Sequence, residues 1–245
     1  MYVVLSGWVS EYRQLRDGTR QILDFRLPGE VTGTECLLYD NALYSAVTVT
    51  DSTVASISRE LFEETQRKFP RLASAFLLSR IANMAALQER AVLIGRRPAF
   101  SRIAHLLMEL DWRLRRCGLV PNGRIPFPLK QQDIADCTGL TSPYVNRVLK
   151  DMRARGLISL QDDVLEIGNP VELTRHAGFN PNYLEPAGQT EWQLPAGTRR
   201  PNGAVPAIPP GDASVAVWNA GAAKEQDIRA ERVPHSADMT GLIRG

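Results

Sequence analysis

Alternating apolar and polar residues dominate the start of the chain. The segment VVLSGWVSEYRQL alternates in part, a turn follows around the Asp-Gly pair at 17–18, and RQILDFRL alternates again. An Asp-Gly pair between two alternating runs is a strong hairpin signal. The later segment TVTDSTVASIS is rich in Thr, Val and Ser, which suit strands. The pattern therefore predicts a small antiparallel β-roll or barrel within residues 1–70.

Helical spacing replaces this alternation from Arg59 onward. After the Phe69-Pro70 break, a run without Gly or Pro extends to Ile94, before a break expected at 95–98. Such a helix spans roughly 36 Å at about 1.5 Å per residue. Its apolar stripe needs a partner helix, which the small β-module is too small to provide in full. We therefore predict a dimerisation helix and hinge over residues 71–98, with burial inside the same chain as the alternative. The stripe comprises Leu72, Leu77, Ile81, Met84, Leu87 and Ala91.

A second helical pattern covers residues 99–117 and is followed by a Gly- and Pro-rich loop at 118–128. Two short helices and a hairpin are expected next. We predict that residues 99–185 form a separate C-terminal domain, so the chain belongs to the α+β class. Residues 186–245 contain seven Pro, seven Gly and eleven Ala without a period, which predicts a flexible low-complexity tail.

The stretch 130–167 carries the most informative spacing. The small residue Ala135 is followed four positions later by Gly139, which can adopt a positive φ and end a helix in a sharp turn. Thr141 is placed to cap the next helix, and Pro143 falls in its first turn. Apolar residues then recur at helical spacing at Val145, Val148, Leu149 and Met152. This spacing predicts a helix-turn-helix, and LISL and VLEI after Gly156 predict a wing hairpin.

The outward face of the second helix is polar. A helix of this size fits the major groove of DNA, where Arg reads guanine, Asn reads adenine and hydroxyls reach bases or phosphates. We predict base contacts from Arg147 first, then from Ser142, Tyr144 and Asn146, and phosphate contacts from Thr141 and Lys150. The alternative is a helical hairpin used only for packing. The polar face, the adjacent wing and the local charge all argue against that alternative.

The charge of the chain is unevenly distributed. The formal net charge is only +2, but residues 96–155 carry twelve Lys and Arg against five acidic residues. A clustered basic surface attracts polyanions such as DNA, although many basic stretches are ordinary solvated surface.

Three cysteines lie far apart and form no CxxC pair, which fits a reducing compartment. The chain has no run of about 18 apolar residues and no secretory signal pattern, so we expect a cytoplasmic protein that is not embedded in a membrane.

These features together resemble the Crp/Fnr family of bacterial transcription regulators. GLTSPYVNRVLKDMRARGLI is similar to the recognition segment and first wing strand of that family. VVLSGWVSEYRQLRDGTRQILDFRLPGE is similar to its cyclic-nucleotide-binding β-roll around a Pro-Gly-Glu corner. AGFNPNYLEP resembles the segment that closes the DNA-binding domain in one branch. The resemblance covers residues 2–186 and begins within the roll, which we expect to be short at its N-terminal side.

The resemblance implies a homodimer that binds a palindromic site in double-stranded DNA, with an effector-sensing roll that biases the DNA-binding domains. RNA polymerase is a further candidate partner, and the small-molecule effector is unknown. Candidate effector residues are Gly29, Glu30, Gly33, Thr34, Tyr44 and Ser45.

Two departures from the family pattern argue against cyclic AMP. Members that bind cyclic nucleotides carry a Glu for the ribose and an Arg for the phosphate. Here Thr34 stands at the Glu position, or Glu35 after a one-residue shift, and Tyr44 replaces the Arg. A phosphate site without Arg lacks a charge-assisted bidentate clamp. Cys36 alone in the β-rich part cannot form a four-cysteine iron–sulfur site, and we expect no cofactor and no metal.

No GxxxxGK[ST], GxSxG, HExxH or GxGxxG motif occurs, and the three histidines are scattered. We therefore expect no enzymatic activity. A catalytic protein built on the roll is the interpretation with the least support. A stronger alternative is a ligand-sensing or protein-interaction module whose winged helix has lost DNA binding.

Overall fold

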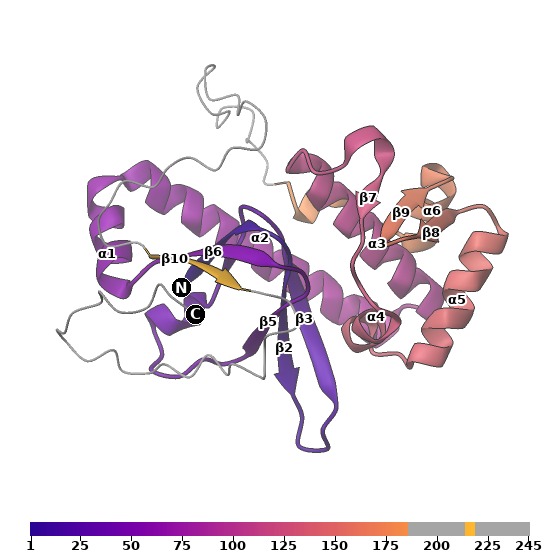
Figure 1. The fold of residues 1–245 in the computed structure, drawn as a ribbon, viewed down its shortest axis with the longest axis horizontal. Helices are drawn as coiled ribbons and strands as arrows, with labels where there is room; N and C mark the ends of the chain where they lie inside the picture. Colours follow the sequence, from indigo (N-terminus) through magenta and orange to yellow (C-terminus); the bar gives the residue numbers. More distant parts are fainter. Residues whose placement is uncertain (186–213, 219–245) are drawn as a thin grey trace.

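The computed structural model describes residues 1–185 and 214–218, which form a β-rich half and a winged-helix half joined by a long helix (Figure 1). The β-rich half has two antiparallel sheets. The first has the order β10-β6-β1-β4, with β1 (Tyr2–Ser6), β4 (Val31–Thr32), β6 (Ser52–Ser56) and β10 (Ser214–Trp218). The second has the order β3-β2-β5, with β2 (Val9–Gln14), β3 (Arg20–Arg26) and β5 (Ser45–Thr48). The predicted antiparallel roll is confirmed.

The predicted hairpin joins β2 to β3. Gly18 has a positive φ of 84°, and Asp17 Oδ1 accepts hydrogen bonds from the backbone N and the hydroxyl of Thr19. This Asx-type turn fixes the register in which Val9 pairs with Arg26 and Gln14 with Arg20. Between β4 and β5 the chain forms the 3₁₀ helix η1 (Thr34–Leu37).

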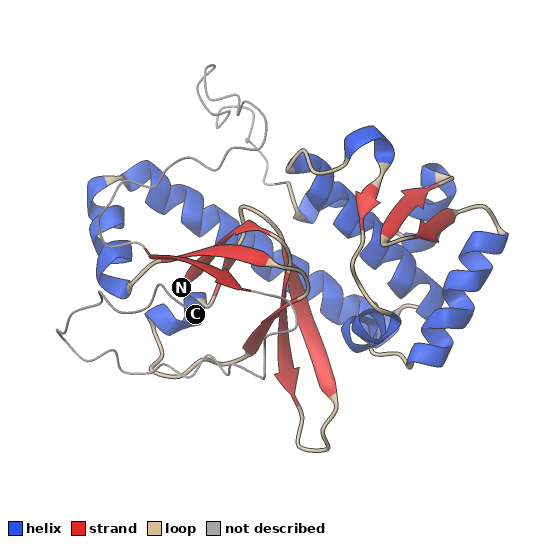
Figure 2. Ribbon diagram, viewed as in Figure 1, coloured by secondary structure: helices blue, strands red, loops and turns tan. Residues whose placement is uncertain are grey.

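The helices α1 (Arg59–Lys68) and α2 (Pro70–Arg96) follow the roll (Figure 2). Ser58 caps α1, since its Oγ accepts a hydrogen bond from Leu61 N. The helix α2 has 27 residues and continues through Gly95, so the predicted break there was wrong. The chain leaves the helix at Arg97, whose ψ of 147° reflects the extended conformation that Pro98 imposes on the preceding residue. A glycine inside a helix lowers the stability of the helix by only about 1 kcal/mol relative to alanine, so α2 can continue through Gly95.

The C-terminal half contains α3, the predicted two short helices, the wing and a closing helix. Its elements are α3 (Ala99–Arg116), η2 (Pro121–Gly123), β7 (Ile125–Pro126), α4 (Gln131–Thr138), α5 (Ser142–Ala154), β8 (Ile158–Gln161), β9 (Val164–Ile167), α6 (Pro170–Ala177) and η3 (Pro181–Tyr183). The strands form a sheet of order β7-β9-β8, so the wing has a third strand that the sequence had not predicted.

The largest hydrophobic core joins both halves. Helix α3 buries Ile103, Leu107, Leu110 and Leu114 completely, as its periodicity predicts. The same cluster takes in Phe25 and neighbouring residues of β3, together with the apolar face of α5. The roll therefore packs directly on the DNA-binding half.

Buried charges also connect the halves, and no local pattern predicted them. Arg113 on α3 donates to Asp24 Oδ1 at 3.0 Å, to Glu109 Oε1 at 3.2 Å and to the carbonyl of Phe25 at 2.6 Å. Arg90 on α2 bonds Glu109, Asp24 and the carbonyl of Leu23. Asp24 thus links α2 and α3 to β3.

Burial raises the pKa of Asp24, but the guanidinium groups of Arg113, Arg26 and Arg90 outweigh this effect and hold the pKa well below its usual range. Burial likewise opposes the charge of Arg113, yet its acidic partners raise its pKa well above the usual value. Asp24 and Arg113 therefore stay charged because their oppositely charged partners stabilise the ionised form.

Composition alone did not predict β10. The residues Ser214–Trp218 fall within the predicted flexible tail, yet they pair with β6. The remainder of that tail prediction, residues 186–213 and 219–245, lies outside the described residues. In the part of the chain that the structure describes, no helix has the length and apolar composition needed to cross a membrane.

Candidate nucleic-acid interface

The helix-turn-helix forms as its spacing predicts. Helix α4 ends at Gly139, whose φ of 67° lies in the left-handed region, and Leu140 N donates to the carbonyl of Ala135 across the turn. Thr141 occupies the N-cap position of α5, and Pro143 lies in the first turn. The side chain of Thr141 makes no capping hydrogen bond, so the predicted capping role was wrong and only the position holds.

The apolar face of α5 packs inward. Val145, Val148, Leu149 and Met152 are all buried, and together they fix the rotation of α5 about its axis. The opposite face, which carries the predicted DNA contacts, is therefore turned to solvent.

Arg147 lies at the centre of that outward face. Its guanidinium carbon is 4.3 Å from the centre of the Tyr144 ring, which orients a flexible side chain. Thr141, Tyr144, Arg147 and Lys150 are exposed. Among residues 1–185, neither Arg147 nor Lys150 forms an ion pair, so both cations are available to an anionic ligand.

Ser142 and Asn146 are only half-exposed because they contact α4. Ser142 Oγ donates to Gln132 Oε1 at 2.6 Å, and Asn146 Nδ2 donates to Gln131 Oε1 at 2.9 Å. The sequence prediction missed both glutamines. Their position at the start of the first helix, facing the start of the second, was the available signal.

The wing carries acidic residues at its tip. Asp162 and Asp163 have φ values of 49° and 55°, as expected for a tight hairpin turn between β8 and β9. Two carboxylates at this turn repel a phosphate backbone. The wing tip is therefore not a phosphate-binding element, whereas α5 presents Arg147 and Lys150 to solvent.

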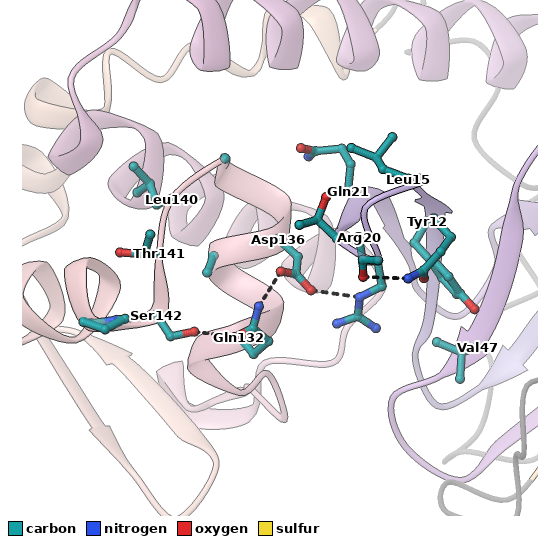
Figure 3. A pocket seen from close by; sticks show the side chains of 16 residues that line it. Tyr12, Leu15, Arg20, Gln21, Val47, Gln132, Asp136, Leu140, Thr141 and Ser142 are labelled. Atoms are coloured by element: carbon teal, nitrogen blue, oxygen red, sulfur yellow. Dashed lines mark hydrogen bonds and ion pairs between the residues drawn. The ribbon is translucent and has the colours of Figure 1, made fainter.

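A cleft of about 960 Å³ separates the β2–β3 hairpin from the helix-turn-helix (Figure 3). At this cleft Arg20 Nε donates to Asp136 Oδ2 at 2.8 Å, and its Nη2 donates to Asp133 Oδ1 at 2.9 Å. The two carboxylates are one turn apart on α4, and Ser142 lies at the other end of the cleft. Arg20 of the roll thus binds α4 at Asp136, which accepts a hydrogen bond from Gln132 Nε2 at 2.6 Å. Gln132 in turn accepts from Ser142 at the start of α5.

The candidate effector residues separate into two groups. Glu30 is engaged with Arg113, whose Nε lies 3.1 Å from Glu30 Oε1, and Gly29 lies in the turn before it with its N bonded to the carbonyl of Val4. Glu30 thus belongs to the ion cluster between the halves.

The second group comprises Gly33, Thr34, Tyr44 and Ser45. Gly33 N donates to Tyr44 Oη at 3.3 Å, and Thr34 Oγ1 accepts from Arg80 Nη1 of α2 at 3.2 Å. Burial raises the pKa of the Tyr44 phenol and lowers that of Arg80, with Arg26 adding repulsion to Arg80. Gly33, Thr34 and Tyr44 are therefore already hydrogen-bonded within the chain.

Nearby polar atoms in the roll have no partner among the described residues. They are Ser10 Oγ, Glu11 Oε1, Arg26 Nε, Thr32 Oγ1 and Glu35 Oε2. The described residues contain no cluster of His, Cys, Asp or Glu that could hold a metal ion, and no disulfide joins the three cysteines.

Both halves match known family models. A Crp-like helix-turn-helix domain matches residues 101–176, and a cyclic nucleotide-binding domain matches residues 1–68. The nitrogen fixation regulation protein FixK of Rhizobium meliloti (strain 1021) is 37% identical over 162 residues, covering 66% of this chain and 70% of that protein. This chain is a member of the Crp/Fnr family. Like its relatives, the chain is a DNA-binding transcription regulator.

Further relatives agree with this assignment to the Crp/Fnr family. The fumarate and nitrate reduction regulatory protein of Vibrio cholerae is 25% identical over 180 residues, covering 74% of this chain and 72% of that protein. The solved structure of FixK2 from Bradyrhizobium japonicum is 27% identical, with a TM-score of 0.64 over 73% of this chain and 87% of that one. The two curated relatives named here are regulatory proteins.

Proposed function

We propose that the chain acts as a homodimer that places one α5 helix of each protomer in the major groove of a palindromic duplex. The observation that carries the proposal is the outward face of α5, where Arg147 and Lys150 are exposed without an ion pair within residues 1–185. Crp/Fnr regulators bind DNA as dimers, and α2 provides a surface for pairing. We place this activity in the bacterial cytoplasm because the chromosome lies there.

The dimer surface is the apolar stripe of α2. Leu77, Ile81 and Met84 are 60%, 49% and 56% exposed, and Leu72 and Leu87 continue the stripe. Only Ala86, Arg90 and Leu93 of this helix are buried in the described protomer. A contiguous exposed apolar surface on a long helix marks an interaction site, and a second copy of the same helix is complementary to it.

We propose that residues 1–70 form the roll, residues 71–98 the dimerisation helix and hinge, and residues 99–185 the DNA-binding domain. Arg147, Ser142, Tyr144 and Asn146 would contact bases, and Thr141 and Lys150 would contact phosphates. Ser142 and Asn146 must exchange their bonds with Gln132 and Gln131 for bonds with DNA.

An effector that enters the roll must displace the Arg80–Thr34 and Tyr44–Gly33 hydrogen bonds. These bonds and the absence of an arginine at position 44 support a regulator that does not respond to cyclic AMP. Gly29, Glu30, Gly33, Thr34, Tyr44 and Ser45 stay candidate effector residues, and RNA polymerase stays a partner suggested by the resemblance alone.

Replacing Arg147 by alanine should weaken specific DNA binding by about 1–3 kcal/mol and relax the preference at one base position. The reason is that Arg147 is the cation best placed to form two hydrogen bonds with a guanine. Fluorescence anisotropy on the selected duplex and on duplexes with single base changes measures both effects.

The matched variant for this test is Lys150→Ala on the same face of α5. Because Lys150 is proposed to contact a phosphate, its replacement by alanine should weaken binding to all sequences equally. It should also lower the slope of log affinity against log salt by about 1. Unchanged sequence preference in Arg147→Ala would show that Arg147 does not read a base.

A further inference from the structure

The outer strand of the roll's first sheet comes from the far end of the chain. Strand β10 pairs antiparallel with β6 along its full length, from Ser214 opposite Ser56 to Trp218 opposite Ser52. The sheet order β10-β6-β1-β4 makes β10 the edge strand, and Figure 1 shows it lying along β6. Without β10, β6 would be bonded to β1 on one side only.

The exposed edge of β6 would have no protection of its own. The strand sequence Ser-Thr-Val-Ala-Ser contains no charged residue and no proline, and its pairing with β10 shows no register shift. Proteins protect exposed sheet edges with charges, prolines, bulges or a covering segment, because an open edge binds other extended chains. Covering is therefore the form of protection that β6 shows.

The segment at 214–218 has the chemistry of an edge-binding strand. Its sequence, Ser-Val-Ala-Val-Trp, is mostly apolar, contains two β-branched valines and lacks charge and proline. A free five-residue strand binds weakly, but a tether raises its effective concentration to roughly the millimolar range. Residues 186–213 connect Glu185 to β10 in the same chain, so the strand and the edge that it covers are covalently linked.

We propose that the edge of β6 is a strand-binding site whose occupant is the chain's own segment 214–218, held within the same protomer. The segment is thus an integral strand of the roll. Its main-chain hydrogen bonds supply the affinity, as in other cases where a peptide extends a sheet. Removing it leaves the edge of β6 without a partner strand.

Hydrogen exchange on the full-length chain tests the proposal. The variant carries two neighbouring prolines, Ala216→Pro and Val217→Pro. Because successive amides point to opposite sides of a strand, one of these substitutions removes a donor that faces β6. The control carries the same change beyond β10, at Ala222→Pro and Ala223→Pro.

We expect exchange of β6 amides at residues 52–56 to be at least about tenfold faster in the variant than in the original chain, which corresponds to a loss of about 1.4 kcal/mol in local opening. The control should match the original chain, and peptides from α3 should be unchanged in both, which verifies folding. Equal protection of β6 in variant and original would overturn the proposal.

A mixing experiment determines whether β10 comes from the same protomer as β6 or from another copy of the chain. The double-proline variant is labelled by mass and mixed with an excess of the original chain. If β10 binds within its own protomer, β6 of the labelled variant stays unprotected. Recovery of protection would show that the strand is exchanged between copies, which contradicts the proposal as stated.

Discussion

Replacing Arg113 by leucine should lower the free energy of unfolding by about 3–5 kcal/mol. The guanidinium bonds Asp24, Glu109 and the carbonyl of Phe25 between α3 and β3. Arg113 is also bonded to Glu30, so the substitution removes the cation that several buried acceptors share. Removing one partner of a buried ion pair lowers the free energy of unfolding by more than the intact pair contributes to it. The reason is that the remaining charge stays desolvated without its partner.

Urea unfolding at pH 7 and a fixed protein concentration measures this loss. The matched control is Arg175→Leu, where an exposed arginine lies 3.6 Å from Glu172 on the surface of α6. Exposed pairs contribute about 0–1 kcal/mol, so the control should change stability little. Equal effects of the two substitutions would show that the cluster between the halves does not stabilise the fold.

The Arg113 cluster also predicts a loss of stability in acid. The folded pKa of Asp24 is held below its unfolded value, so its contribution is complete above the unfolded pKa of about 3.9. The contribution falls as the pH drops from that value towards the folded pKa. The stability difference between Arg113→Leu and the original chain should therefore narrow in this range.

Charged substitutions in the stripe of α2 should convert the dimer to a monomer. In the double variant Leu77→Glu and Ile81→Glu, four like charges would meet at the pairing surface of a dimer. Desolvating them is unfavourable, whereas both positions are exposed in the protomer and can carry a charge without loss of folding. Sedimentation or light scattering measures the change in mass.

Affinity for a two-half-site duplex should fall by at least about a hundredfold in this variant. The second half-site is bound at high effective concentration only when the two helices α5 belong to one particle. Ser79→Glu is the control, because Ser79 is exposed on α2 away from the stripe. A stable dimer of the double variant would place the interface elsewhere.

Much of the fold could be predicted because local patterns determine it. Alternation around the Asp-Gly turn at 17–18 gave the β2–β3 hairpin, and the spacing from Ala135 through Gly139 to Val145 gave the helix-turn-helix. In each case the residues that decide the structure are close in sequence. The predicted break at Gly95 was wrong because the helix continues through this glycine and ends only before Pro98.

Long-range pairings could not be predicted in the same way. Arg113 and Asp24 are far apart in sequence, and nothing in their neighbours indicates that both are buried. The same holds for Arg20 with Asp133 and Asp136, and for β10 with β6. For the candidate site, the sequence predicted the outward face of α5 but not the hydrogen bonds that this face donates to Gln131 and Gln132.

We infer that the two α5 helices of a homodimer read a specific palindrome. Selection of bound sequences from a random duplex library, using the purified full chain without added ligand, tests it most directly. We expect an enriched palindrome with half-sites about one helical turn apart, and loss of preference at one position in each half-site with Arg147→Ala. A chain that binds duplex in low salt yet enriches no sequence, or enriches a single unrepeated half-site, would contradict it.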